Sequence, residues 1–188
     1  LSGAVFLFVN APPWEYLAAL NKPPGADIIP AYRKERGGED VGVSRETIVP
    51  QLKKAGLSDM ERLGQMMTAY RQESGALVAP DSAGPAAWLN RDDRWPYLIL
   101  SGKDLAGFVL VQRHSYLKGE DAFSVADFYL LPFFRGGGRA QRVIRELFEV
   151  FRGPWQVKWH PGNAAGAAFW QKAVSQFVGS RWELHPGI

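Results

Sequence analysis

The sequence has no cysteine among its 188 residues. This absence excludes disulfide bonds, thiolate metal sites and a cysteine nucleophile together. It also fits a reducing compartment, so we expect a cytoplasmic protein. The three histidines, His114, His160 and His185, are far apart in the sequence, and no H-E-x-x-H pattern is present. We therefore predict no metal site.

Long apolar runs are missing as well. The longest, residues 4–9, is far shorter than the ~20 residues that a membrane-spanning helix needs, and no basic segment precedes it. The net charge is only +3, and the basic residues are scattered. So small an excess does not favour nucleic-acid binding. We expect neither a membrane nor a nucleic-acid partner.

Aromatic and turn-forming residues are plentiful. The 7 Trp and 11 Phe can supply core area, whereas 13 Pro and 20 Gly indicate many turns. The length suits one domain, with or without an appendage. Two Pro-Pro pairs and a charged stretch set the start apart from the more regular remainder. We predict an N-terminal extension of unknown role over residues 1–48, with a short strand at residues 5–9, and one domain over 49–188.

A strand and a helix open the predicted domain. The strand is expected at residues 48–54, and Ser58-Asp59-Met60-Glu61 has the spacing of a capping box that begins a helix. One face of that helix is apolar, with Leu63, Met66, Met67 and Tyr70 at i, i+3, i+4 and i+7. A loop over residues 79–96 follows and is long enough to border a binding site, although its Trp88 and Trp95 also suit a core.

Three β-rich runs come next, at residues 97–101, 106–113 and 123–131. Gly102-Lys103-Asp104 separates the first two and is a hairpin signal. The third run ends apolar on both faces, which is typical of a strand in the middle of a sheet. We therefore predict an antiparallel meander.

The turn Gly136-Gly137-Gly138 leads from that meander into an amphipathic helix, in which Ala140, Val143, Ile144, Leu147, Phe148 and Phe151 keep a 3.6-residue period. Arg135, Arg139 and Arg142 crowd the helix N-terminus, where the helix dipole disfavours cations. A bound polyanion would make the interaction energy of these cations favourable. Glycine amides at a helix N-terminus are suited to a phosphate.

Another strand and helix complete the pattern. Residues 155–159 form a strand that is parallel to the previous one if the helix between them is a crossover. Pro161-Gly162-Asn163 ends it, a helix follows with Ala167, Trp170, Val174 and Phe177 on one face, and residues 181–184 make a last strand. The fold class is therefore α/β of the α+β kind, with a mixed sheet.

This order of motifs resembles the GCN5-related N-acetyltransferase (GNAT) superfamily. Arg135-Gly136-Gly137-Gly138-Arg139-Ala140 is similar to that family's acyl-CoA pyrophosphate loop, and residues 131–136 resemble the segment that enters it. Pro161-Gly162-Asn163 with residues 167–172 is similar to the family's asparagine and the helix after it. The likeness spans residues 48–188. It implies a mostly antiparallel central sheet with a splayed parallel pair, flanked by helices.

The resemblance implies acetyl-CoA, or another acyl-CoA, as cofactor. The residues that would bind it are Phe128, Leu130, Leu131 and Asn163 along the pantetheine, Arg135, Gly136, Gly137, Gly138, Arg139 and Ala140 at the pyrophosphate, and Trp170 at the leaving thiolate. Asn163 is equally suited to capping the last helix. Trp170 stands where many members have a tyrosine that serves the leaving thiolate. Because an indole donates a hydrogen bond but gives up no proton, the acid is left open between Trp170 as donor, water and Tyr129.

Amine acylation also needs a base, since the attacking nitrogen must be neutral. Asp127, just before the pantetheine segment, is the first candidate, directly or through a water. It would alternatively bind a substrate ammonium. His160, at the end of the next strand, is the rival. Without cysteine, we expect direct attack of the amine on the thioester rather than an acyl-enzyme.

We therefore predict an acyl-CoA-dependent N-acyltransferase that acts on a small-molecule amine. Acylation of a protein terminus or lysine is a second possibility. A non-catalytic GNAT-like module that binds acyl-CoA or another partner is a third, and Trp170 favours it. Trp88, Trp95 and Tyr116 are candidates to line the acceptor site. The acceptor amine and the formation of a homodimer stay open at this point.

Overall fold

The structure is a computed structural model that describes the backbone of Val5–Val9 and Ile28–Ile29 and, with side chains, residues 50–75, 84–89, 91–117 and 121–185. In chain order the elements are β1 (Val5–Val9), β2 (Ile28–Ile29), β3 (Pro50–Lys54), η1 (Leu57–Asp59), α2 (Met60–Ser74), η3 (Pro85–Ala87), β4 (Arg94–Ser101), β5 (Asp104–Arg113), β6 (Phe123–Leu130), η4 (Pro132–Phe134), α3 (Arg139–Val150), β7 (Trp155–Trp159), α4 (Ala164–Val178) and β8 (Trp182–His185).

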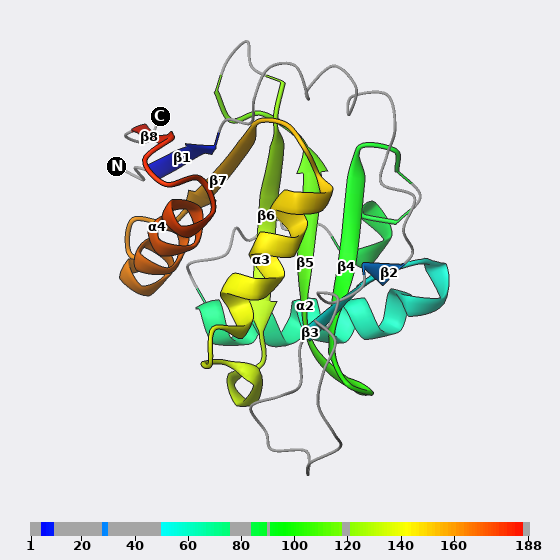
Figure 1. Cartoon of the computed structure of the whole chain (residues 1–188). Coiled ribbons are helices and arrows are strands. Elements are labelled where there is room, and N and C mark those ends of the chain that lie inside the picture. Colours follow the sequence, from blue (N-terminus) through cyan, green and yellow to red (C-terminus); the bar gives the residue numbers. More distant parts are fainter. Residues whose placement is uncertain are drawn as a thin grey trace, which may run out of the picture.

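The described strands form one sheet of eight, in the order β2-β3-β4-β5-β6-β7-β1-β8. Its neighbours are antiparallel except for β6 and β7, which are parallel and joined through α3. The helices α3 and α4 cover one face of the sheet and α2 covers the other (Figure 1). The predicted fold class and the β4–β5–β6 meander are confirmed.

The two faces of the sheet bury separate apolar clusters. On the α3 side, Val143, Ile144 and Leu147 are fully buried and join Val109 and Val157 from the strands. On the opposite side, α2 packs Leu63 and Met67 against β5 and β6. Both predicted helix faces are therefore confirmed. The apolar area that they remove from water is the main source of stability.

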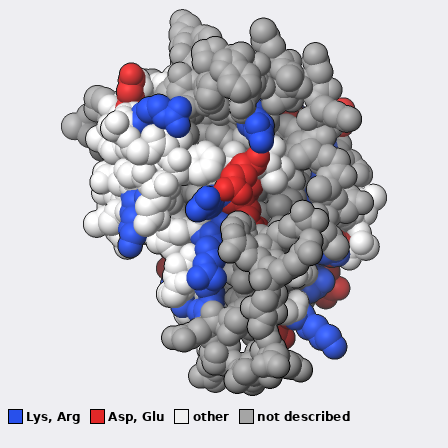
Figure 2. Space-filling view, in the orientation of Figure 1, with Lys and Arg blue, Asp and Glu red and all other residues white. Residues whose placement is uncertain are grey.

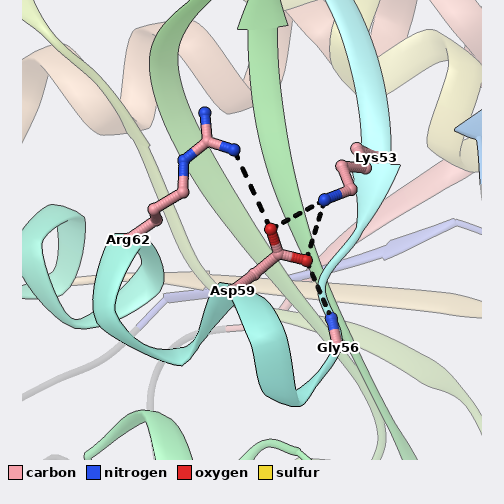
Figure 3. A network of polar contacts seen from close by, with 4 residues as sticks. All are labelled: Lys53, Gly56, Asp59 and Arg62. Atoms are coloured by element: carbon pink, nitrogen blue, oxygen red, sulfur yellow. Dashed lines mark hydrogen bonds and ion pairs between the residues drawn. The ribbon is translucent and has the colours of Figure 1, made fainter.

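The start of α2 differs from the prediction. A single turn of 3-10 helix, η1, precedes it, and the capping carboxylate belongs to Asp59 rather than to a box opened by Ser58. Asp59 Oδ2 accepts a hydrogen bond from the Gly56 amide at 3.2 Å. Its carboxylate also pairs with Lys53 Nζ at 2.7 Å and lies 3.9 Å from Arg62 (Figure 3). Asp59 is 4% exposed, so this network joins β3 to the start of α2 through a nearly buried charge.

The predicted strand at residues 5–9 is present as β1, and it lies inside the sheet rather than beside it. Val5–Val9 pairs with β7 on one edge and with β8 on the other, both antiparallel. Ile28–Ile29 pairs with β3 at the far edge. The domain division at residue 48 stays a prediction. No helix in the described part of the chain is long and apolar enough to cross a bilayer.

Candidate functional site

The parallel strands β6 and β7 separate soon after they meet. They pair at only three positions, Phe123 with Trp155, Ser124 with Gln156 and Val125 with Val157. From Ala126 onward, no described residue of β6 has a partner in β7. The predicted splay in the parallel pair is therefore confirmed. On the side of β7, the second half of β6 therefore has no partner strand in the described part of the chain.

A β-bulge lies at the point of separation. Leu110 of β5 is opposite Asp127, but the next residue, Val111, is opposite Val125, so Ala126 is the extra residue of β6. A bulge shifts the alternation of side chains by one. Before it, Phe123 and Val125 point into the α3-side cluster; after it, Phe128 and Leu130 do so. The bulge therefore turns the side chain of Asp127 toward α2.

Asp127 is held there by groups from α2. Its carboxylate accepts a hydrogen bond from the Tyr70 hydroxyl and lies in the electrostatic field of the Arg71 guanidinium. Burial raises the pKa of Asp127 to about 6, and the Tyr70 hydrogen bond and the charge of Arg71 oppose that rise. Since this pKa lies below 7, the carboxylate is mostly ionised at neutral pH and is able to accept a proton.

Tyr129, the next residue on the same face, is also tied to α2. It is 6% exposed, and its hydroxyl donates a 2.9 Å hydrogen bond to Glu73 Oε2. Burial raises the pKa of Tyr129, and the Glu73 carboxylate adds to the effect. Its proton is therefore hard to lose, and its proposed part as an acid stays a prediction.

The glycine turn has the geometry of an anion cradle. Gly136, Gly137 and Gly138 have φ of 86°, 58° and 71°, a left-handed region that favours glycine. A Cβ built on Gly136 or Gly138 would meet no atom within 4 Å, so the loop faces open space. Within the described residues, the amides of Gly137, Gly138, Ala140 and Gln141 donate no hydrogen bond. These four donors lie at the N-terminus of α3.

The charges along α3 run against its dipole. The first turn carries no acidic residue and the last turn no basic one. On the face seen in Figure 2, Lys and Arg atoms gather along the part of α3 nearer the glycine turn, and Asp and Glu atoms lie beyond them. In the sequence of α3, Arg139 and Arg142 lie in the first turn and Glu149 in the last. An anion at the N-terminus would compensate the basic end.

Of the three arginines predicted at this corner, Arg135 is the most constrained. Its Nη1 lies 2.6 Å from Glu73 Oε1, and its Nε donates to the Leu130 carbonyl at 2.8 Å. Arg139 Nη1 donates a longer bond, 3.4 Å, to the carbonyl of Arg135. Arg142 is exposed.

Aromatic rings close the splay on the α3 and α4 side. The ring of Phe128 stacks on Phe169 of α4 with centroids 5.5 Å apart. The rings of Phe128 and Trp170 pack in a T-shaped arrangement with centroids 6.0 Å apart. Trp170 is 8% exposed, so its indole belongs to the core wall at the predicted thioester end. Leu130 and Leu131 are also predicted along the pantetheine. The carbonyl of Leu130 accepts a hydrogen bond from Arg135 Nε, and the amide of Leu131 donates one to the Ala106 carbonyl.

Asn163 and His160 have local structural roles. Asn163 Oδ1 accepts the Gly166 amide at 2.8 Å, so the capping role is present; the pantetheine role stays a prediction. His160 is exposed, and its Nδ1 accepts the Gly162 amide at 3.0 Å in the turn after β7. No described contact joins His160 to Asp127. Within the described residues, no group of three His, Asp or Glu side chains gathers to hold a metal ion.

Two of the three aromatic residues predicted to line the acceptor site are core residues. Trp88 and Trp95 are 7% and 5% exposed and belong to the two cores, and Trp95 lies in β4 rather than in a loop. Tyr116, by contrast, lies in the electrostatic field of Asp127, and Lys158 Nζ is 4.9 Å from its ring. Gln156 fixes this segment because its Oε1 accepts the Tyr116 amide at 2.6 Å.

Several solved structures are similar to this one. A ribosomal-protein-alanine N-acetyltransferase from Brucella melitensis biovar Abortus aligns with a TM-score of 0.52 and 19% identity, over 66% of this chain and 89% of its own. AAC(6')-Iy, bound to the bisubstrate analog CoA-S-monomethyl-acetylneamine, aligns at 0.51 and 17%, over 66% and 88%. A Chromobacterium violaceum protein assigned to the GNAT acetyltransferases aligns at 0.50 and 18%, over 81% and 83%.

The chain has the GNAT fold. No protein-family model and no curated protein matches its sequence. Within this GNAT fold the predicted loop, the splay and Asp127 occupy one region around β6. Sequence reasoning missed Glu73 and Tyr70. The only signal for them was their i, i+3 spacing on the face of a helix predicted to cover the sheet.

Proposed function

We propose that this chain is an acyl-CoA-dependent N-acyltransferase, with acetyl-CoA as the first candidate donor and a small-molecule amine as acceptor. The observation that carries the proposal is the set of amides of Gly137, Gly138, Ala140 and Gln141, which donate no hydrogen bond within the described residues and lie at the N-terminus of α3 beside the splay of β6 and β7. The GNAT neighbour bound to a CoA-linked bisubstrate analog supports the same ligand class. The residues present fit the phosphates of such a ligand because the loop is open, donor-rich and flanked by Arg139 and Arg142.

In this proposal bound acyl-CoA supplies an acyl group already activated as a thioester. The loop amides hold the phosphates, and the edge of β6 after Ala126, on the side of β7, aligns the pantetheine. Asp127 accepts the proton of the attacking amine as nitrogen forms the new bond to the acyl carbon. The carbon–sulfur bond of the thioester then breaks, and CoA leaves as its thiolate. The Asp127 carboxylate is placed for its role by Tyr70 and by the bulge. Trp170 contributes packing, and at most a hydrogen-bond donor, at the leaving sulfur.

Calorimetric titration with CoA and with acetyl-CoA tests the binding step. We expect micromolar dissociation constants for the wild type and no detectable binding for Gly138→Glu, because a carboxylate would enter the phosphate cradle. Gly138→Asn is the matched control, since asparagine tolerates the left-handed conformation without adding charge. Absence of CoA binding by the folded wild type would refute the proposal.

The class of acceptor needs a second experiment, because one neighbour is named for a ribosomal protein and another was solved with an acetylneamine analog. Thiol release from acetyl-CoA over a panel of small amines should show turnover. Lysate proteins incubated with labelled acetyl-CoA should stay unlabelled by mass spectrometry. Label on protein would favour the protein-acylating alternative, and CoA binding without either reaction would favour a non-catalytic module.

A further inference from the structure

Glu73 of α2 and Arg135 of the loop entry form a clamp that no prediction from the sequence included. Two nitrogens of the guanidinium reach the two carboxylate oxygens, Nη1 at 2.6 Å from Oε1 and Nη2 at 2.8 Å from Oε2. The pair is therefore bidentate, which is the strongest geometry for this ion pair. The two residues are 62 positions apart in the sequence. The contact thus joins two separate elements of the fold.

The rest of the Arg135 side chain is also engaged. Its Nε donates to the carbonyl of Leu130, the last residue of β6, at 2.8 Å. Its Cζ lies 5.5 Å from the ring centroid of Tyr129, and the Tyr129 hydroxyl donates to the same Glu73 oxygen at 2.9 Å. Arg135 therefore faces the end of β6 and α2 with all three of its nitrogens. These contacts use three of the five guanidinium N–H donors and hold the side chain against the end of β6 and α2.

The clamp lies at the entry to the glycine turn. Arg135 precedes Gly136, so its side chain fixes the residue from which the glycine turn departs. Glycines at positive φ are flexible, and a loop that must be ordered at the moment of binding loses affinity. On α2, Glu73 lies one turn beyond Tyr70, the residue that hydrogen-bonds Asp127. The same helix face therefore supports both the anion loop and the proposed base.

We propose that Arg135 is a positioning residue, clamped by Glu73 so that the amides of Gly137, Gly138, Ala140 and Gln141 converge. The phosphates are contacted by those four amides and by the side chains of Arg139 and Arg142. This inference rests on the proposed function for the identity of the ligand. It changes the role given to Arg135 by the resemblance, from a direct contact to a support of the loop. It also makes Glu73, an acidic residue, a requirement for binding an anion.

The two roles predict opposite effects of removing Glu73. If Arg135 supports the loop, Glu73→Gln and Arg135→Gln each weaken CoA binding about tenfold, and the double variant is no weaker than the worse single variant. If Arg135 binds phosphate directly, Glu73→Gln releases the guanidinium, and CoA binding stays equal or tightens. Calorimetric titration of CoA against the four proteins separates these outcomes. Equal or tighter binding by Glu73→Gln would overturn the clamp.

Salt dependence and a conservative variant separate positioning from a general structural defect. The slope of log Kd for CoA against log salt should be the same in Arg135→Gln as in the wild type, because no contact to phosphate is lost. Arg142→Gln should lower that slope. Arg135→Lys should bind as weakly as Arg135→Gln, since an ammonium cannot replace the forked contacts to Glu73 and Leu130. Full rescue by lysine would show a point charge acting on phosphate.

Arg145→Gln provides the matched control. Arg145 pairs with Glu149 at 2.9 Å on the same α3, so this variant also removes an exposed ion pair while leaving the loop entry alone. Its CoA affinity should equal that of the wild type. If the wild type itself binds no CoA, hydrogen exchange of the hydrogen-bonded amides of Leu131, Phe134, Arg135 and Arg139 still tests the clamp. Both Glu73→Gln and Arg135→Gln should speed exchange there to the same extent, and unchanged exchange would refute the clamp without reference to function.

Discussion

Asp127 is the residue on which the proposed chemistry depends, and its titration offers a direct test. Burial raises its pKa to about 6, so the amine-acylating rate should rise with pH through an apparent pKa near 6. Asp127→Asn should lower kcat/KM about 10²-fold or more at pH 7.5 and abolish the rise in rate with pH near 6. The measurement is a pH profile of thiol release, with CoA affinity as the control that should not change.

The same shift predicts a change in stability with a defined sign. The folded pKa of Asp127 lies above its unfolded value of 3.8, so the folded state favours the protonated form, and stability falls as pH rises through about 6. Asp127→Asn should therefore raise the free energy of unfolding at pH 8 by up to about 3 kcal/mol and change it little at pH 4. Urea denaturation should be done in a Glu146→Gln background, because the pKa of Glu146 is raised to about 7 by burial and by Glu149. Equal denaturation curves at pH 8 would contradict the burial of this charge.

At the scale of the elements, β5 and β6 approach so closely at one point that only glycine fits. A Cβ at Gly107 would lie 2.1 Å from the carbonyl oxygen of Tyr129 and 3.0 Å from Leu130 Cα. Gly107→Ala should therefore cost about 3 kcal/mol or more, measured by urea denaturation, because backbone has to move. Gly64→Ala is the control. Its Cβ would meet only Pro85 Cγ at 3.4 Å inside α2, so it should gain up to about 1 kcal/mol.

Local periodicity was enough to predict the meander, α2, α3 and the glycine turn, because those signals come from residues close in sequence. The site itself depends on pairings between distant residues. The bulge at Ala126 arises from the register of β6 on β5, and it alone places Asp127 on the α2 side. The Glu73 carboxylate reaches Arg135 only once α2 has packed on the sheet. Neither feature has a sequence signature of its own.

For the whole molecule, the central question is how the two ends of the described chain depend on each other. β1 lies between β7 and β8, and among the described strands it is the only neighbour of β8 (Figure 1). Leu7 is opposite Val157 on one side and Leu184 on the other. A strand paired on both edges uses its backbone N–H groups fully, and proline removes one and fixes φ. Disruption of β1 should therefore release β8 from the sheet.

Leu7→Pro tests this dependence. We expect the amides of Trp182–His185 to exchange quickly with solvent, whereas those of α2, β4 and β5, at the other side of the sheet, keep their protection. Hydrogen exchange with mass spectrometry resolves the segments. Ile29→Pro is the control, because β2 is an edge strand and its loss should leave β8 protected. Slow exchange of β8 in Leu7→Pro would mean that α4 alone holds β8 in place. Fast exchange would show that residues 5–9 complete the GNAT sheet and thereby support the β6–β7 splay from its far side.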